Sequence, residues 1–282
     1  MVKGVESKAI VISASSDIGF ALCERWMSQG RTVVGTYRSD SPSVQRLRSS
    51  GIRLVHCDLV DRSSVHNACN ELRTMCAGWE TLVVCPGSTD PVGAFDQCDF
   101  DEWESSVRVN FTAQMQVIHE LLPFRSLSAT PGAGVILFAG GGTNNAPCNY
   151  SAYIISKIAL IKMCELLDAE LPNTRFTILG PGWVKTKIHH SSLRAPARAG
   201  ANYQRIIDRF NSNNWTPMEA VLDCCDWIVS QPRQTVGGRN FSLVNDPWGT
   251  PELEMALLQD QNLYKLRRHG NDRLVKNTQA RG

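Results

Sequence analysis

The sequence predicts a doubly wound α/β domain, in which helices cover both faces of a parallel sheet. Short apolar runs rich in β-branched residues alternate along the chain with longer segments of helical periodicity. The runs are apolar at consecutive positions, as expected for strands that are buried on both faces. The order of strand, turn, helix and strand repeats through most of the chain, which favours a parallel sheet with crossover helices.

Six apolar runs are the predicted strands, and polar or glycine-containing turns bound them. They cover residues 9–12, 32–36, 53–56, 81–85, 135–139 and 176–179. In the stretch after the first run, apolar residues recur at helical spacing at Ile18, Leu22 and Trp26, and Gly30 follows where a helix would end. The longest helical stretches cover residues 103–122 and 153–171. In such a fold the ligand binds at the carboxyl ends of the strands.

Two segments fall outside this alternation. The polar, basic segment 187–216 is long enough to be a lid over a substrate, with a tolerated surface insertion as the alternative. The second segment is the tail from residue 246. We therefore expect a single nucleotide-binding and catalytic domain over residues 1–245, with the lid inside it, and a C-terminal extension over 246–282.

Composition excludes several classes of protein. The 282 residues are 43% hydrophobic and 20% charged, with 29 basic against 27 acidic side chains. These values exclude a disordered chain and a strongly nucleic-acid-seeking surface. The apolar runs are too short for a membrane span, and the first residues do not read as a signal peptide. We expect a soluble, cytoplasmic protein that binds neither nucleic acid nor a membrane.

The ten cysteines are expected to be reduced and to act mainly as small buried hydrophobic residues. Those that lie singly in apolar runs are Cys23, Cys57, Cys69, Cys85 and Cys164. Cys224 and Cys225 have no C-x-x-C partner and no histidine at zinc spacing, so no metal site is predicted.

The turn after the first predicted strand is a candidate anion site. It reads Ser13, Ala14, Ser15, Ser16, Asp17, Ile18, Gly19. Exposed N–H groups and the dipole of the following helix favour a dinucleotide diphosphate there. Only Gly19 remains of the glycines usual in such a fingerprint, so a plain strand-to-helix turn is the alternative.

Tyr153 and Lys157 form a Tyr-x-x-x-Lys motif that opens a predicted helix. Residues four apart share one face of a helix, so the Lys157 ammonium can lie near the Tyr153 phenol. A free phenol has a pKa near 10, and a nearby cation lowers the pKa by favouring phenolate. The pair is therefore a candidate proton shuttle for alcohol and carbonyl chemistry.

Together these motifs resemble the short-chain dehydrogenase/reductase family, over about residues 8–244. The resemblance implies a Rossmann-like fold and three catalytic roles. The family's tyrosine moves a proton at the reacting oxygen, and its lysine lowers the tyrosine pKa and holds the nicotinamide ribose. An asparagine on the preceding helix supports a proton-relay water. Tyr153, Lys157 and Asn110 match these positions.

The resemblance also places the cofactor. The matching segments are the serine-rich turn, an Asp-Leu pair near the adenine, the end of the fourth strand, and a Pro-Gly-x-Val-x-Thr segment near the nicotinamide. The implied cofactor-binding residues are Ser13, Ser15, Ser16, Asp17, Ile18, Gly19, Arg38, Asp58, Leu59, Pro86, Gly87, Tyr153, Lys157, Pro181, Gly182, Val184 and Thr186.

Three departures from the family pattern stand out. The family's catalytic serine would lie thirteen residues before the tyrosine, where this chain has Gly140. We expect the Thr143 hydroxyl, or backbone N–H groups of the glycine run, to replace that donor. At the turn, Ser13 and Asp17 replace glycines, and Asp17 is expected to cap the helix, with its carboxylate oxygens accepting from main-chain N–H groups of the first turn. In the third, Val84 and Cys85 stand where the family has an asparagine-containing segment.

The end of the second strand indicates NADP as cofactor, with NAD less favoured. An acidic residue there would bind the ribose hydroxyls of NAD, whereas an arginine suits the 2′-phosphate of NADP. This chain has Tyr37 and then Arg38.

The sequence thus predicts an NADP(H)-dependent oxidoreductase that acts on a carbonyl or hydroxyl of a small polar substrate. Basic residues of the lid and tail favour an anionic or sugar-derived molecule; they are Lys187, His189, His190, Arg194, Arg198, Arg267, Arg268 and His269. The alternatives are a catalytically impaired nucleotide-binding sensor or scaffold, and an epimerase or dehydratase that uses bound NADP transiently. The resemblance implies a homodimer or homotetramer.

Overall fold

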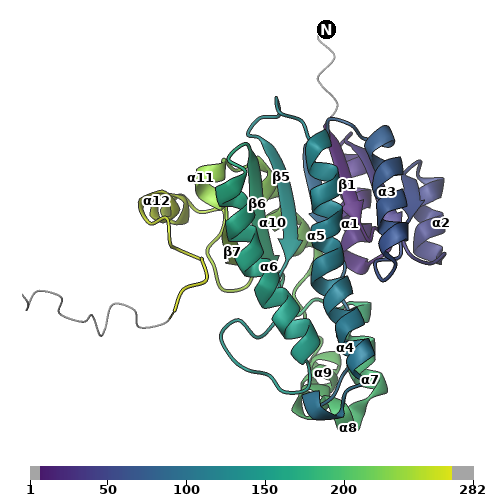
Figure 1. The fold of residues 1–282 in the computed structure, drawn as a ribbon. Coiled ribbons are helices and arrows are strands. Elements are labelled where there is room, and N and C mark those ends of the chain that lie inside the picture. The colour runs from purple at the N-terminus through teal and green to yellow at the C-terminus, as the bar shows by residue number, and fades with distance from the viewer. Residues whose placement is uncertain (1–6, 269–282) are drawn as a thin grey trace, which may run out of the picture.

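A computed structural model describes residues 7–268, and within them seven strands form one parallel sheet (Figure 1). The strand order is β3-β2-β1-β4-β5-β6-β7. The strands are β1 (Lys8–Ile12), β2 (Thr32–Tyr37), β3 (Arg53–His56), β4 (Thr81–Val84), β5 (Ala133–Phe138), β6 (Thr174–Gly180) and β7 (Arg239–Ser242). The predicted doubly wound fold is confirmed, with β7 added to the six predicted strands.

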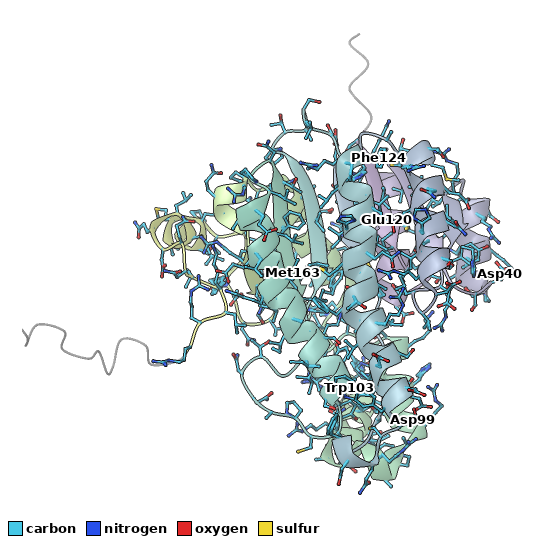
Figure 2. All side chains as sticks on the ribbon, in the orientation of Figure 1. Asp40, Asp99, Trp103, Glu120, Phe124 and Met163 are labelled. Carbon is cyan, nitrogen blue, oxygen red and sulfur yellow. The ribbon has the colours of Figure 1, made fainter. Side chains whose placement is uncertain are left out.

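Helices cover both faces of the sheet. They are α1 (Asp17–Ser28), α2 (Pro42–Ser49), α3 (Arg62–Met75), α4 (Phe100–Val107), α5 (Ala113–Leu121), α6 (Ser151–Glu170), α7 (His190–Arg194), α8 (Pro196–Ala199), α9 (Ala201–Ser212), α10 (Met218–Ser230), α11 (Arg233–Val236) and α12 (Pro251–Gln259). Buried residues of α3, α5 and α6 form one core with the sheet, and those of α1, α10 and α12 form the other. In Figure 2, Glu120 and Met163 mark the neighbouring α5 and α6 on the same face.

The helical stretch predicted over 103–122 is two α-helices joined by a π-helical turn, Arg108–Thr112. Trp103 of α4 donates from Nε1 to the Ser151 hydroxyl at 2.9 Å and so ties α4 to the start of α6. Figure 2 shows Trp103 at this end of the two helices. The π-helical turn contains one residue more than an α-helical turn, and it lies at the same level as the site described below.

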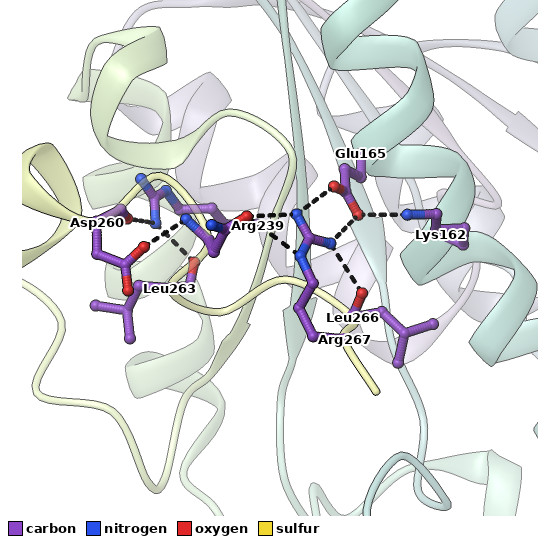
Figure 3. A network of polar contacts seen from close by, with 8 residues as sticks. Lys162, Glu165, Arg239, Asp260, Leu263, Leu266 and Arg267 are labelled. Atoms are coloured by element: carbon purple, nitrogen blue, oxygen red, sulfur yellow. Dashed lines mark hydrogen bonds and ion pairs between the residues drawn. The ribbon is translucent and has the colours of Figure 1, made fainter. Parts of the chain in front are cut away.

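The segment after β7 packs against the domain as far as it is described. Arg239 of β7 is fully buried and donates to the carbonyls of Asp260 (3.2 Å) and Leu263 (2.6 Å) (Figure 3). Farther along, the Arg267 guanidinium pairs with Glu165 of α6 at 2.8 Å. These contacts hold residues 260–267 against the edge strand β7 and helix α6. The boundary between 1–245 and 246–282 stays a prediction, and His269 lies outside the described residues.

Most of the cysteines that lie singly in apolar runs are buried, as predicted. Cys23, Cys57, Cys69 and Cys164 are buried, whereas Cys85 is half-buried at the end of β4. Burial raises the pKa of the Cys23 thiol to about 12. Within residues 7–268 no helix is long and apolar enough to cross a membrane, and no group of His, Cys, Asp and Glu is arranged to hold a metal ion.

Candidate active site

The candidate residues lie where the parallel strands end. Because the strands are parallel, their carboxyl ends meet at one edge of the sheet: Ile12 pairs with Val84, and Val84 with Leu137. The loops that leave this edge contain residues 13–16, 85–87, 140–143 and 181–186. This edge is therefore the place at which a ligand would meet all of the predicted segments.

Tyr153 lies in the first turn of α6, with its phenol against the backbone of Gly140. A Cβ atom added at Gly140 would lie 2.5 Å from the Tyr153 Oη and 2.8 Å from two ring carbons. Real side chains do not approach so closely, so position 140 accepts a side chain only if the phenol moves. With Tyr153 in this place, glycine is the residue that fits at position 140.

Lys157 is buried one helical turn farther along, and its ammonium joins two strand ends. Its Nζ donates to the carbonyl oxygens of Phe138 at 3.0 Å and Pro86 at 3.4 Å. The same nitrogen lies 5.7 Å from the centre of the Tyr153 ring. Burial lowers the pKa of Lys157 to about 8, partly offset by Cys85.

The pKa of Tyr153 differs from the sequence expectation. Burial raises it to about 12, so in this arrangement the phenol is held protonated instead of being activated toward phenolate. Burial is the cause of this shift, and the Lys157 ammonium is directed at the carbonyls of Phe138 and Pro86. The role of Lys157 in stabilising the Tyr153 phenolate stays a prediction.

Asn110 is fully buried in the π-helical turn between α4 and α5. Its Nδ2 donates to the carbonyl of Ser88 at 2.8 Å and to that of Ser106 at 3.0 Å, and its Oδ1 accepts from the Ser88 N–H at 3.0 Å. The side chain therefore fixes the loop after β4. A relay water would have to use the main chain of this turn.

Gln114 is a site residue that sequence reasoning missed. It is fully buried on α5, and its Nε2 donates to the carbonyl of Pro86 at 3.3 Å, the same oxygen that accepts from Lys157. The available signal was its position four residues after Asn110, which places both amides on one helical face. Gln114 and Asn110 together hold the segment 86–88 against the site.

Thr143 is half-buried in the loop between β5 and α6, and it makes no hydrogen bond with another described residue. Gly141 has no atom within 4 Å of an added Cβ, whereas Gly142, with φ of +101°, packs against Ile154. Neither Thr143 nor the glycine run is fixed as the replacement donor, and that role stays a prediction.

The serine-rich turn corrects the expected role of Asp17. Ser16, not Asp17, is the N-cap of α1, and its hydroxyl accepts from the Gly19 N–H at 3.1 Å. Ser13 has φ of +59°, a conformation that favours glycine. A Cβ on Gly19 would lie 2.5 Å from the Ser13 carbonyl, so Gly19 is required for the close approach of helix and turn. The Asp17 carboxylate instead accepts from the main-chain N–H of Lys187 at 2.7 Å.

The adenosine end of the predicted site lies after β2 and β3. Arg38 is exposed directly after β2. The guanidinium of Arg48 on α2 lies 4.7 Å from the centre of the Tyr37 ring and pairs with Asp40 at 2.8 Å. Sequence reasoning missed Arg48 because only the fold brings α2 to the end of β2.

The Asp-Leu pair after β3 has two different roles. The carboxylate of Asp58 accepts from the Val60 N–H at 3.0 Å, which closes a local turn. Leu59 is buried in the core beneath that turn. Asp58 thus shapes the loop near the expected adenine, and Leu59 anchors it.

The segment after β6 supports the base of the lid. Pro181 is half-buried, Val184 is buried, and Gly182 adopts φ of +74°, where an added Cβ would lie 2.7 Å from the Thr216 hydroxyl. Val184 pairs with Thr216 in an isolated bridge, which joins the two ends of the lid. Thr186, half-buried, is the last residue before the short helical turn that begins the lid.

The basic residues of the lid are not gathered into one anion site. His189 is stacked on Trp183 and lies at a tilt against Trp215, at ring-centre distances of 5.6 and 5.2 Å, and burial lowers its pKa. Arg194 pairs with Asp90 at 3.5 Å. His190 and Arg198 are exposed. The lid therefore uses much of its charge and aromatic surface in its own packing.

Known proteins are similar to this chain in sequence and in fold. The model of the family described as short chain dehydrogenase matches residues 7–196. The short-chain dehydrogenase/reductase SDRA of Arabidopsis thaliana is 25% identical over 252 residues, which cover 83% of this chain and 95% of the relative.

Two solved structures share the fold. A short chain dehydrogenase/reductase from Saccharomyces cerevisiae superposes with a TM-score of 0.76 at 20% identity, covering 86% of this chain and 97% of that one. A short chain dehydrogenase from Burkholderia cenocepacia in complex with NADP superposes with a TM-score of 0.69 at 21% identity, covering 84% and 95%. Since the family model spans more than half of the sequence and the sheet has the same architecture, the chain belongs to the short-chain dehydrogenase/reductase family.

Proposed function

We propose that this member of an oxidoreductase family transfers hydride between NADP(H) and a carbonyl or hydroxyl carbon of a small polar substrate. The observation that carries the proposal is the meeting of Tyr153, Lys157 and Asn110 at the carboxyl ends of β4 and β5. Binding alone does not require a phenol, a buried ammonium and a buried amide at one strand edge. Proton transfer at a reacting oxygen uses such a set.

The residues present fit a dinucleotide. Gly19 permits close packing at the turn. Gly87 lies near the Lys157 ammonium and has no side chain to occupy the space beside it; a Cβ added at Gly87 would lie 3.9 Å from the Lys157 Nζ. That ammonium is a buried cation with two carbonyl partners and no carboxylate. The turn 13–19 would hold the diphosphate, and the segments 86–87 and 181–186 would hold the nicotinamide half.

The cofactor supplies the hydride chemistry when bound, and the protein's own residues handle the proton. In the direction of reduction, the Tyr153 phenol donates its proton to the carbonyl oxygen, and its raised pKa keeps that proton available at neutral pH. Lys157 stabilises the phenolate that remains, and the main chain around Asn110 refills the proton through water. In oxidation the same groups act in reverse.

NADP is the proposed cofactor because cations stand at the end of β2. Arg38 directly follows Tyr37, and Arg48 lies over the Tyr37 ring, in the region where a 2′-phosphate would lie. A guanidinium matches phosphate through its planar fork. The Burkholderia cenocepacia neighbour was solved with NADP, which supports the same choice.

Titration with NADPH and NADH, followed by cofactor fluorescence, tests the cofactor proposal. We expect NADPH to bind at least about tenfold more tightly than NADH, and Arg38→Ala to weaken NADPH by about tenfold, since one charge-assisted phosphate contact is lost. The control is Arg73→Ala on α3, an exposed arginine stacked on Phe124, which should leave both affinities unchanged. Equal affinity of the wild type for both cofactors would contradict the proposal.

Turnover is then measured on ketones, aldehydes and sugar derivatives that do or do not bear an anionic group. NADPH-dependent turnover of at least one of them establishes the reductase. The second candidate function is a nucleotide-binding sensor, which the glycine at position 140 in place of the family's serine favours. Binding of NADPH without any turnover would support the sensor.

The pH dependence of reduction gives a further test. The charge of Lys157 is present below its pKa of about 8 and lost above it, because burial disfavours the ammonium. Above that pH we expect kcat/KM to decrease, with a slope that approaches about tenfold per pH unit. Lys157→Arg, which stays charged, should move the decline to higher pH even where its rate at pH 7 is lower. A wild-type profile that stays flat over two pH units above that value would exclude this role of Lys157.

Self-association through the face of α4 and α6 is also proposed. Ile155 and Leu166 of α6 are 51% and 44% exposed, and Phe100 at the start of α4 is 61% exposed and stacked on Trp103. Apolar side chains at these positions favour burial against a second copy of the chain.

A further inference from the structure

The carboxylate of Asp17 lies where the proposed function needs an anion to bind. Asp17 is the first residue of α1, at the turn assigned to the cofactor diphosphate. A negative charge there stabilises the helix but repels a second anion at the same place. The site therefore needs a compensating positive charge close to Asp17.

Lys187 supplies that charge from a segment 170 residues away. Its main-chain N–H donates to Asp17 Oδ2 at 2.7 Å, and its ammonium lies 3.7 Å from Asp17 Oδ1. The ammonium also donates to the carbonyl of Ser15 at 3.2 Å. Three contacts thus hold one lysine against the turn. Its side chain remains half-exposed, so the ammonium is open to a ligand.

Lys187 is the first residue of the lid. The two ends of the lid, around residues 183–189 and 215–216, are held together. Val184 and Thr216 pair in a bridge, the Thr216 N–H donates to the carbonyl of Trp183 at 2.8 Å, and His189 packs against two tryptophans. The position of Lys187 is therefore set by the lid base as well as by Asp17.

We propose that Lys187 neutralises Asp17 and so allows a turn that carries a carboxylate to bind the diphosphate of the cofactor. The inference rests on the proposed function, because it assumes that a dinucleotide binds at this turn. Asp17 fixes the lysine, and the lysine presents its ammonium to the diphosphate. Because Lys187 belongs to the lid, the affinity for the cofactor then depends on the position of the lid relative to the turn 13–19.

A double-mutant cycle on the dissociation constant of NADPH tests the pairing. Lys187→Met should weaken NADPH by about tenfold or more in the wild type, because an uncompensated Asp17 then faces the diphosphate. In an Asp17→Asn background the same change should weaken binding by less than about threefold, because the repelling charge is gone. The affinity is read by fluorescence titration, without turnover.

Lys162→Met is the matched control. Lys162 is an exposed lysine of α6, outside the proposed cofactor site, whose ammonium pairs with Glu165 at 2.9 Å, and its loss should leave NADPH affinity unchanged. Wild-type binding that is unaltered by Lys187→Met, or an equal loss in both backgrounds, would overturn the pairing while leaving the proposed function intact. Failure of the wild type to bind NADPH would instead overturn both.

Discussion

Gly140→Ser is expected to lower kcat by about 100-fold, although it restores the residue that the family pattern has at this position. The added Cβ would lie 2.5 Å from the Tyr153 Oη, and the atom that must yield is the end of a side chain, not backbone. The phenol therefore moves, and a displacement of about 1 Å at a reacting group can reduce the rate about 100-fold. Single-turnover rates of the wild type and the variant measure this effect.

Two further variants provide reference values of kcat for Gly140→Ser. Tyr153→Phe removes the proton donor, with an expected loss of about 10² to 10⁴ in kcat. This loss is the largest that displacement of the phenol can cause. Gly141→Ser places the same side chain one residue later, where an added Cβ meets nothing within 4 Å, and should leave kcat within about twofold of the wild type.

The unfolding midpoint distinguishes a local from a global effect. Because the clash in Gly140→Ser is relieved by the phenol, the variant should unfold close to the wild type while it loses turnover. A kcat equal to or above that of the wild type would show that Tyr153 adjusts freely, and that Gly140 is not a positioning residue.

Much of the fold could be predicted because local pattern and tertiary structure agree. The buried strands are continuous apolar runs, and the turn after β1 is followed by helical periodicity up to the positive φ of Gly30. The edge strand β7 was missed because it lacks such a run: its residues Arg239–Ser242 alternate between buried and half-buried positions and include a buried arginine. The π-helical turn was missed because one extra residue hardly alters a helical pattern.

The site could be predicted as a set of residue types but not as a set of contacts. Tyr153 and Lys157 share a helix, so their spacing alone relates them. The pairing of Asp17 with Lys187, and the contact of Gly140 with Tyr153, depend on how separate segments pack. The raised pKa of Tyr153 likewise follows from burial, which spacing does not reveal.

Arg175→Leu is expected to destabilise the protein by about 3 to 5 kcal/mol, the largest stability change proposed for the molecule. Arg175 of β6 is 4% exposed, and it donates to four main-chain carbonyls at the far edge of the sheet from the site; these belong to Gly132, Ile228, Val229 and Gln231. Burial lowers its pKa to about 10.

The acceptors explain the size of this effect. Ile228 and Val229 lie at the end of α10, where the helix dipole favours a cation. Leucine fills part of the space but removes the guanidinium donor from these carbonyls, of which, within residues 7–268, only that of Ile228 keeps a main-chain donor at the helix end, the Gln231 N–H at 3.3 Å. Urea unfolding, with the slope held constant between proteins, measures the free energy that is lost.

Arg53→Leu is the matched control, because it also replaces a strand arginine that donates to a helix carbonyl. Arg53 of β3 donates to Met75 at 2.9 Å but is exposed, so water can replace it, and we expect a loss below about 1 kcal/mol. If Arg175→Leu costs no more than Arg53→Leu, then the buried guanidinium is not what holds the end of α10 to β6, and the desolvation of Arg175 offsets the carbonyl contacts that it makes.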